Sequence, residues 1–118
     1  VWKYFTVWEE QMNLERESYC LIGTLEAWNA MCQYFGREKM IPVYIEVEDG
    51  TRLIRAVERE RTQEHPGYEE LCRRFLADAK DFSEENLKNA GITRRFENKD
   101  MNACLEEIKL FIQKAILI

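Results

Sequence analysis

The sequence predicts a single α/β domain in which mostly parallel strands alternate with amphipathic helices. The segment MIPVYIEV, residues 40–47, is apolar enough to be buried on both faces, as central strands of parallel sheets are. A helical pattern follows it directly. The segment YEELCRRFLADAKDF, residues 68–82, then places apolar residues three and four apart on one helix face. A strand that leads so closely into helices is typical of α/β proteins.

Two further strands and one helix are predicted before residue 40. Residues 3–7 (KYFTV) and 19–22 (YCLI) are short runs of aromatic, β-branched or apolar residues, and we expect both to be strands. Residues 25–35 place apolar residues at helical spacing. Gly36 follows where a helix C-terminus favours glycine, so this segment is predicted to be an amphipathic helix.

After residue 47 the sequence predicts four helices and one strand. The helices are expected at about 49–61, 66–82, 84–90 and 101–115, and the strand at 93–96. The residues expected to cap these helices or to occupy their first turn are Asp49, Pro66, Ser83 and Asp100.

Composition narrows the class of protein. The chain has 118 residues, and 46% hydrophobic residues suffice for one modest core. No apolar run is long enough to span a membrane, and a net charge of -5 is unlike that of a nucleic-acid-binding domain. Four scattered cysteines and one histidine predict no metal site. We expect a cytoplasmic protein with reduced cysteines, cut before Val1.

Eight of the ten arginines lie between residues 52 and 95. The planar guanidinium group suits bidentate contacts to phosphate, so this bias indicates a small anionic ligand. The alternative is that these arginines only solvate helix faces and pair with neighbouring glutamates.

From Ile41 onward, the segments IPVYIEV, GTRLIRAVERERT, YEELCRRFLADAKDF, ITRRF and ENKD follow one another as in the C-terminal half of guanylate kinase, which the chain resembles. Phrases such as YFTV and IGTLE are similar to a divergent bacterial branch of that family. The resemblance implies a partial P-loop-kinase-type fold without its N-terminal half. It would divide the single domain into an acceptor region (1–24), a core (25–58), a lid (59–82) and a C-terminal core (83–118).

The resemblance also implies acceptor-binding residues. YFT at residues 4–6 matches the family's Tyr-Gly-Ser/Thr segment, so Tyr4 is expected to hold the GMP phosphate and Thr6 the guanine. LIGT at residues 21–24 matches the family's Leu-Asp-Ile-Asp strand end, with both carboxylates replaced. Thr24 would lie at the guanine edge, where one hydroxyl replaces a carboxylate that pairs with two N–H groups.

The family's lid begins with Gly-Arg-Gly-Thr, and RERT stands there at residues 59–62. Arg59 or Arg61 would take the place of the first lid arginine, and Arg74 matches the Lys-Arg-Leu helix directly. Their role would be to neutralise the charge on the transferred phosphoryl group. ENKD resembles the family's Val-Asn-Asp-Asp segment, which implies that Asn98 lies at the ATP adenine.

Three functional hypotheses follow. In the first, the chain is a fragment of a kinase that transfers a phosphoryl group from ATP, with Mg²⁺, to GMP or a related monophosphate. No G-x-x-x-x-G-K-[ST] loop occurs in these residues, so the chain alone is expected to be inactive and to self-associate through an uncovered sheet edge. In the second, favoured by the lost carboxylates, it is a non-catalytic guanylate-kinase-like interaction module. In the third, it is an α/β domain that binds no nucleotide.

Overall fold

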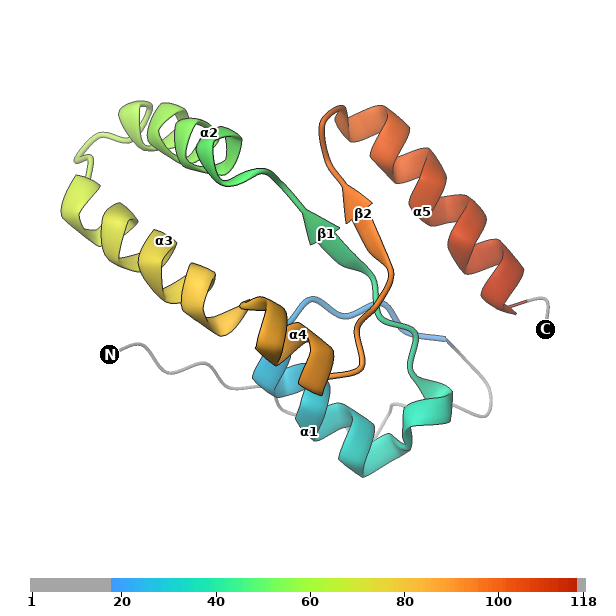
Figure 1. Cartoon of the computed structure of the whole chain (residues 1–118). Helices are drawn as coiled ribbons and strands as arrows, with labels where there is room; N and C mark the ends of the chain where they lie inside the picture. Colours follow the sequence, from blue (N-terminus) through green and yellow to red (C-terminus); the bar gives the residue numbers. More distant parts are fainter. Residues whose placement is uncertain (1–17, 117–118) are drawn as a thin grey trace.

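A computed structural model describes residues 18–116 (Figure 1). Its elements are α1 (Leu25–Phe35), the 3-10 turn η1 (Arg37–Lys39), β1 (Tyr44–Glu46), α2 (Asp49–Arg61), α3 (Tyr68–Asp81), α4 (Glu84–Asn89), β2 (Arg95–Glu97) and α5 (Met101–Ile116). Within this range the fold is mixed α/β but mainly helical, with five α-helices and one small sheet. The predicted strand at 3–7 lies outside the described residues.

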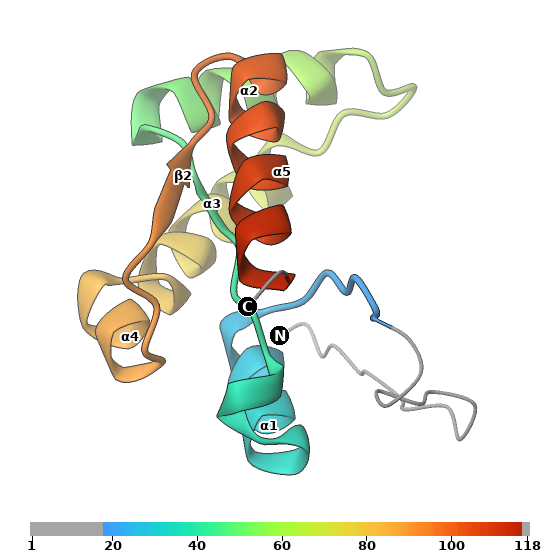
Figure 2. The ribbon, with the colours of Figure 1, turned by 90° about the vertical axis from the view of Figure 1, so that its right-hand side faces the viewer.

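The sheet consists of β1 and β2, which run parallel with Tyr44 opposite Arg95 and Glu46 opposite Glu97. Figures 1 and 2 show α5 on one side of this strand pair, and the antiparallel hairpin of α2 and α3 on the other. The prediction of parallel strands alternating with helices is therefore confirmed for this pair. Among the described residues β1 pairs with β2 alone, so its other edge carries no strand.

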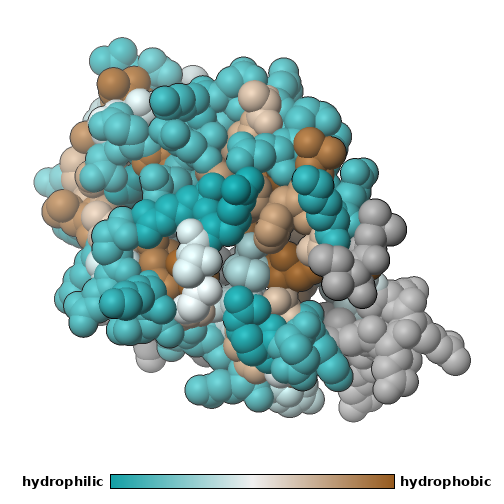
Figure 3. Space-filling view, turned by 45° about the vertical axis from the view of Figure 1, so that its right-hand side comes forward, coloured by the Kyte–Doolittle hydropathy of each residue, from teal (hydrophilic) through white to brown (hydrophobic). Residues whose placement is uncertain are grey.

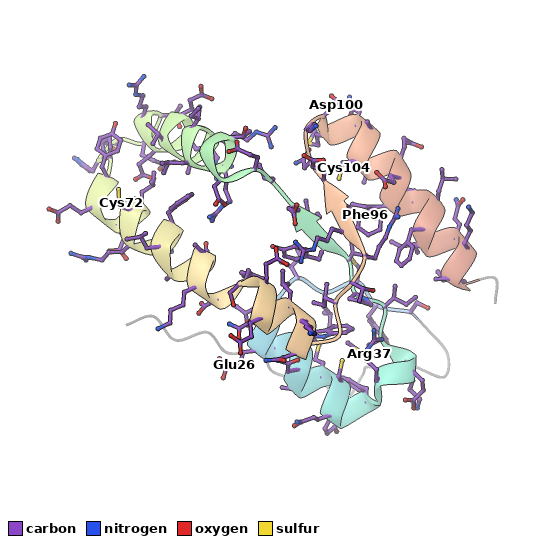
Figure 4. All side chains as sticks on the ribbon, viewed as in Figure 1. Glu26, Arg37, Cys72, Phe96, Asp100 and Cys104 are labelled. Carbon is purple, nitrogen blue, oxygen red and sulfur yellow. The ribbon has the colours of Figure 1, made fainter. Side chains whose placement is uncertain are left out.

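Two groups of side chains form the core. Leu25 and Trp28 of α1 pack with Leu87, Ala90 and Ile92 around α4. On the α5 side, Phe96 of β2 is fully buried, and its ring centroid lies 5.2 Å from that of Phe111. Figure 4 shows Phe96 facing α5, the helix that also carries the buried Cys104. The two groups together hold α1, α4 and α5 to the strand pair.

The predicted helices all form, with two corrections at their first turns. Gly36 ends α1 with φ 97°, and the side chains of Ser83 and Asp100 accept hydrogen bonds at the starts of α4 and α5. Glu48, rather than Asp49, caps α2: the helix begins at Asp49, and the Glu48 carboxylate accepts hydrogen bonds from the amides of Gly50 and Thr51. Pro66 precedes α3, which has Gly67 as its N-cap residue.

The strand predictions need larger corrections. Residues 19–22 form no strand, and the strand predicted at 40–47 is reduced to residues 44–46. The prediction that this strand is buried on both faces is wrong, because Ile45 is 50% exposed. A two-stranded sheet offers too little neighbouring surface to cover it. The strand predicted at 93–96 forms two residues later, at 95–97.

The apolar stripe of α3 is mostly exposed. Leu71 is buried and Phe75 half-buried, whereas Tyr68, Cys72 and Leu76 face solvent. The stripe was predicted to be an inward face, but much of it stays uncovered, because the hairpin extends away from the rest of the fold (Figure 1). Its last residue, Phe82, stacks on Tyr44 of β1. Figure 3 shows a mostly hydrophilic face with apolar surface in separate patches.

Candidate functional site

The three predicted lid arginines lie on the hairpin. Arg59 and Arg61 occupy the last turn of α2, and Arg74 lies in the middle of α3; all three are exposed. Within residues 18–116 neither the Arg59 nor the Arg61 guanidinium forms an ion pair. By contrast, Arg73 on the same hairpin pairs with Glu69 and Glu70.

The hairpin does not bring these arginines to one point. The guanidinium carbon of Arg52 lies 4.0 Å from the centroid of the Phe75 ring, so residue 75 is level with the first turns of α2. Arg74 therefore lies near the base of the hairpin. Arg59 lies seven residues beyond Arg52, roughly 10 Å further along the helix axis. For Arg59 and Arg74 to contact the same bound phosphate chain, that chain would have to extend along the hairpin, or the hairpin would have to bend.

Glu60 has a structural role that the sequence did not reveal. It occupies the position where the resemblance implies a lid arginine, and its carboxylate accepts a hydrogen bond of 2.8 Å from the Gly67 amide. The Thr62 hydroxyl also donates to the carbonyl oxygen of Arg59, at 2.6 Å. These two bonds hold the connection between α2 and α3 in a defined shape.

Of the predicted acceptor residues, only Thr24 belongs to the described part of the chain, and its position does not favour nucleotide binding. Tyr4 and Thr6 lie outside the described residues. Thr24 is the N-cap of α1, and its hydroxyl oxygen accepts a hydrogen bond of 3.2 Å from the Ala27 amide. The residues before it form no strand, so the expected strand end at the guanine edge is absent from the described part of the chain.

Asn98 lies in the turn between β2 and α5. Its amide donates to the Glu46 carbonyl oxygen at 2.8 Å, and its own carbonyl oxygen accepts from Arg55 at 3.0 Å. The side-chain oxygen of Asn98 is buried and has no hydrogen-bond partner within the described residues. Buried acceptors are rarely left unpaired. The structure thus leaves one buried acceptor of the Asn98 side chain without a donor among residues 18–116.

A groove of about 680 Å³ opens beside β1, between the hairpin and α4. Seven charged residues line it. Two are basic, Arg52 and Arg95, and five are acidic: Glu46, Glu48, Asp49, Asp78 and Glu84. The excess of carboxylates disfavours phosphate groups there. The groove itself is of ligand size, but its charge does not suit a nucleotide.

Arg95 organises this groove. Its guanidinium group bonds to Glu46 at 2.7 Å and to both carboxylate oxygens of Glu84. These bonds raise the pKa of Arg95 further and lower the pKa of Glu84. Tyr44, whose ring stacks on that of Phe82, has a raised pKa because burial disfavours its charged form and Glu46 adds to this. Sequence patterns did not predict this cluster, because it depends on the register between β1 and β2.

The described residues do not offer a magnesium site. Among residues 18–116 no group of three or more histidine, cysteine or acidic side chains could hold a metal ion. Glu46 and Glu84 both form ion pairs with the guanidinium group of Arg95. Any Mg²⁺ that accompanies ATP would need ligands from the nucleotide and from other residues.

No protein-family model, no curated protein and no solved structure matches this chain. Across residues 18–116, every helix is too short or too polar to cross a membrane.

Proposed function

We propose that this chain is part of a nucleoside monophosphate kinase that transfers a phosphoryl group from ATP to GMP or a related monophosphate. The α2–α3 hairpin would be the segment that closes over the phosphates. We also propose that the chain has a partial P-loop-kinase-type fold. It is supported by the parallel β1–β2 pair and by the helices that follow each strand.

One observation carries the proposal. The guanidinium groups of Arg59 and Arg61 are exposed and form no ion pair within residues 18–116, although acidic residues are abundant around them. Arginines that only solvate a helix face would be expected to pair with neighbouring glutamates, as Arg73 does. Unpaired guanidinium groups at the end of a hairpin are instead suited to bind phosphate oxygens.

Titration of the 118-residue chain with ADP at low ionic strength tests this proposal. We expect saturable binding that weakens as salt is added, because exposed charges are screened. The double substitution Arg59→Gln and Arg61→Gln should weaken binding by about tenfold or more, equivalent to roughly 1.4 kcal/mol. The matched control is Arg73→Gln on the same hairpin, which should leave the affinity within about twofold. Absence of binding, or equal losses in both variants, would contradict the proposal.

A non-catalytic interaction module is the second candidate, and the position of Thr24 favours it. The hydroxyl that the resemblance places at the guanine edge is engaged in capping α1, so little remains in residues 18–24 to read a base. The gene sequence upstream of Val1 separates the two candidates: an intact glycine-lysine loop supports the kinase, and a degenerate one supports the module.

A further inference from the structure

Arg55 lies in the middle of α2 and fastens this helix to the turn that carries Asn98. One terminal nitrogen of its guanidinium group donates to the Asn98 carbonyl oxygen at 3.0 Å, and the other to the Lys99 carbonyl oxygen at 3.2 Å. These contacts join positions 43 and 44 residues apart in the chain. A rigid fork that spans two successive carbonyls limits how the turn can move relative to the hairpin.

The same turn is held from two other sides. The Asn98 amide bonds to the Glu46 carbonyl oxygen of β1, and the Asp100 carboxylate caps α5, at the turn labelled in Figure 4. Both main-chain groups of Asn98 are therefore hydrogen-bonded, while its side-chain oxygen is buried and accepts no hydrogen bond from any of residues 18–116. Because Arg55 binds the two carbonyl groups on either side of the Lys99 Cα, it restrains the backbone that carries the Asn98 side-chain amide.

Helix geometry then distinguishes the two arginines at the end of α2. Arg59 lies four residues after Arg55, so the two side chains share one face of the helix, one turn apart. Arg61 is two residues further, a rotation of about 200°, and so lies on the opposite face. Since Arg55 contacts the Asn98 turn, the face that looks toward this turn carries Arg59 and not Arg61.

We propose that Arg55 is a positioning residue that couples the hairpin to the Asn98 turn, and that Arg59 is the phosphate-binding arginine on the same face. This inference rests on the proposed function and sharpens it. A nucleotide would place its base toward the Asn98 amide and its phosphates toward Arg59. Arg55 would act without touching the nucleotide, by keeping the turn in the orientation that receives the base.

Two probes separate these roles: ADP, which carries a base, and inorganic pyrophosphate, which does not. Arg55→Met should weaken ADP binding by tenfold or more and leave pyrophosphate binding within twofold. Arg59→Gln should weaken binding of both probes by tenfold or more, whereas Arg61→Gln, on the opposite face of α2, should weaken both by clearly less. Arg55→Lys keeps the charge but reaches one carbonyl at a time, so its ADP affinity should lie between those of Arg55→Met and the wild type.

Hydrogen exchange of the backbone amides of residues 99–104 provides a second measurement. It should accelerate in Arg55→Met and stay unchanged in Arg61→Gln, with far-ultraviolet circular dichroism confirming that both variants fold. Equal loss of ADP and pyrophosphate affinity in Arg55→Met would overturn the positioning role, and equal effects of Arg59→Gln and Arg61→Gln would overturn the choice of Arg59. If the wild-type chain binds neither probe, the proposed function fails. Unchanged exchange at 99–104 in Arg55→Met would show separately that the Arg55 contact does not hold the turn.

Discussion

The indole nitrogen of Trp28 donates a hydrogen bond of 3.0 Å to the carbonyl oxygen of Ala90, across 62 positions of sequence. Both residues are buried. This bond ties α1 to the end of α4 and satisfies a carbonyl group that follows the last turn of a short helix. The neighbouring apolar side chains, Leu25, Leu87 and Ile92, pack around it.

Trp28→Phe should therefore destabilise the chain. The aromatic ring keeps most of the packing, but the Ala90 carbonyl oxygen loses its buried donor, which costs about 1–3 kcal/mol. Chemical denaturation of both proteins measures the difference. Asn29→Ala, an exposed change on the same helix, is the control and should alter stability by less than about 0.5 kcal/mol. A similarly small effect of Trp28→Phe would mean that the bond contributes nothing.

Phe96 is the second position where a large effect is expected. Its side chain is completely buried between β2 and α5, so Phe96→Ala should cost about 3–5 kcal/mol through lost burial and a residual cavity. Since single domains are often stable by only about 5–15 kcal/mol, thermal unfolding should shift strongly or vanish. Leu110→Ala on α5 removes a side chain that is 56% exposed and should have a much smaller effect. Equal shifts for the two variants would refute the burial of Phe96.

Glu48 should make stability depend on pH. Its pKa lies below the ordinary 4.5, chiefly because the Thr51 amide bonds to the carboxylate, with the Gly50 amide and the Thr51 hydroxyl adding to this. A lowered pKa in the folded state contributes stability above 4.5 that is lost as pH falls through the folded value. Glu48→Gln should thus be less stable than the wild type at neutral pH, and the difference should disappear in strong acid. Glu58→Gln, exposed on the same helix, is the control for the loss of one surface charge from α2.

The 118-residue chain mixed with ATP, Mg²⁺ and GMP should form no ADP above background, because it contains no loop to hold the donor phosphates.

In a longer protein that carries such a loop, Arg74→Ala should lower kcat by roughly two to four orders of magnitude. Arg73→Ala, which removes only exposed ion pairs on α3, should leave kcat within a few-fold. Turnover by the short chain, or an unchanged kcat in Arg74→Ala, would argue against these roles.

Local signals predicted the helices well. Ser83 and Asp100 cap the helices that their positions indicated, and the spacing of apolar residues placed α1 at residues 25–35. Strands were predicted less well, because a strand forms only where another strand pairs with it. Residues 19–22 are apolar enough for a strand but have no partner in the described fold, and the long apolar run at 40–47 pairs over only three residues.

The candidate site was only partly predictable. The bias toward arginine indicated an anionic ligand, and the resemblance implied the lid positions, but which arginines pair with acids depends on packing. Arg95 joins Glu46 and Glu84 because β1 and β2 align Tyr44 with Arg95, and no pattern in the sequence sets that register. Arg55 bonds to main-chain carbonyls, which carry no residue-specific signature at all.

Nuclear magnetic resonance of the labelled 118-residue chain can locate bound ADP directly. We expect shifts at the side-chain and backbone signals of Arg59 and in the Asn98 turn, with the acidic groove around Arg95 unaffected. Shifts centred on Arg52 and Arg95, or no shifts at saturating ADP, would contradict the claim that the hairpin and the Asn98 turn together bind a nucleotide.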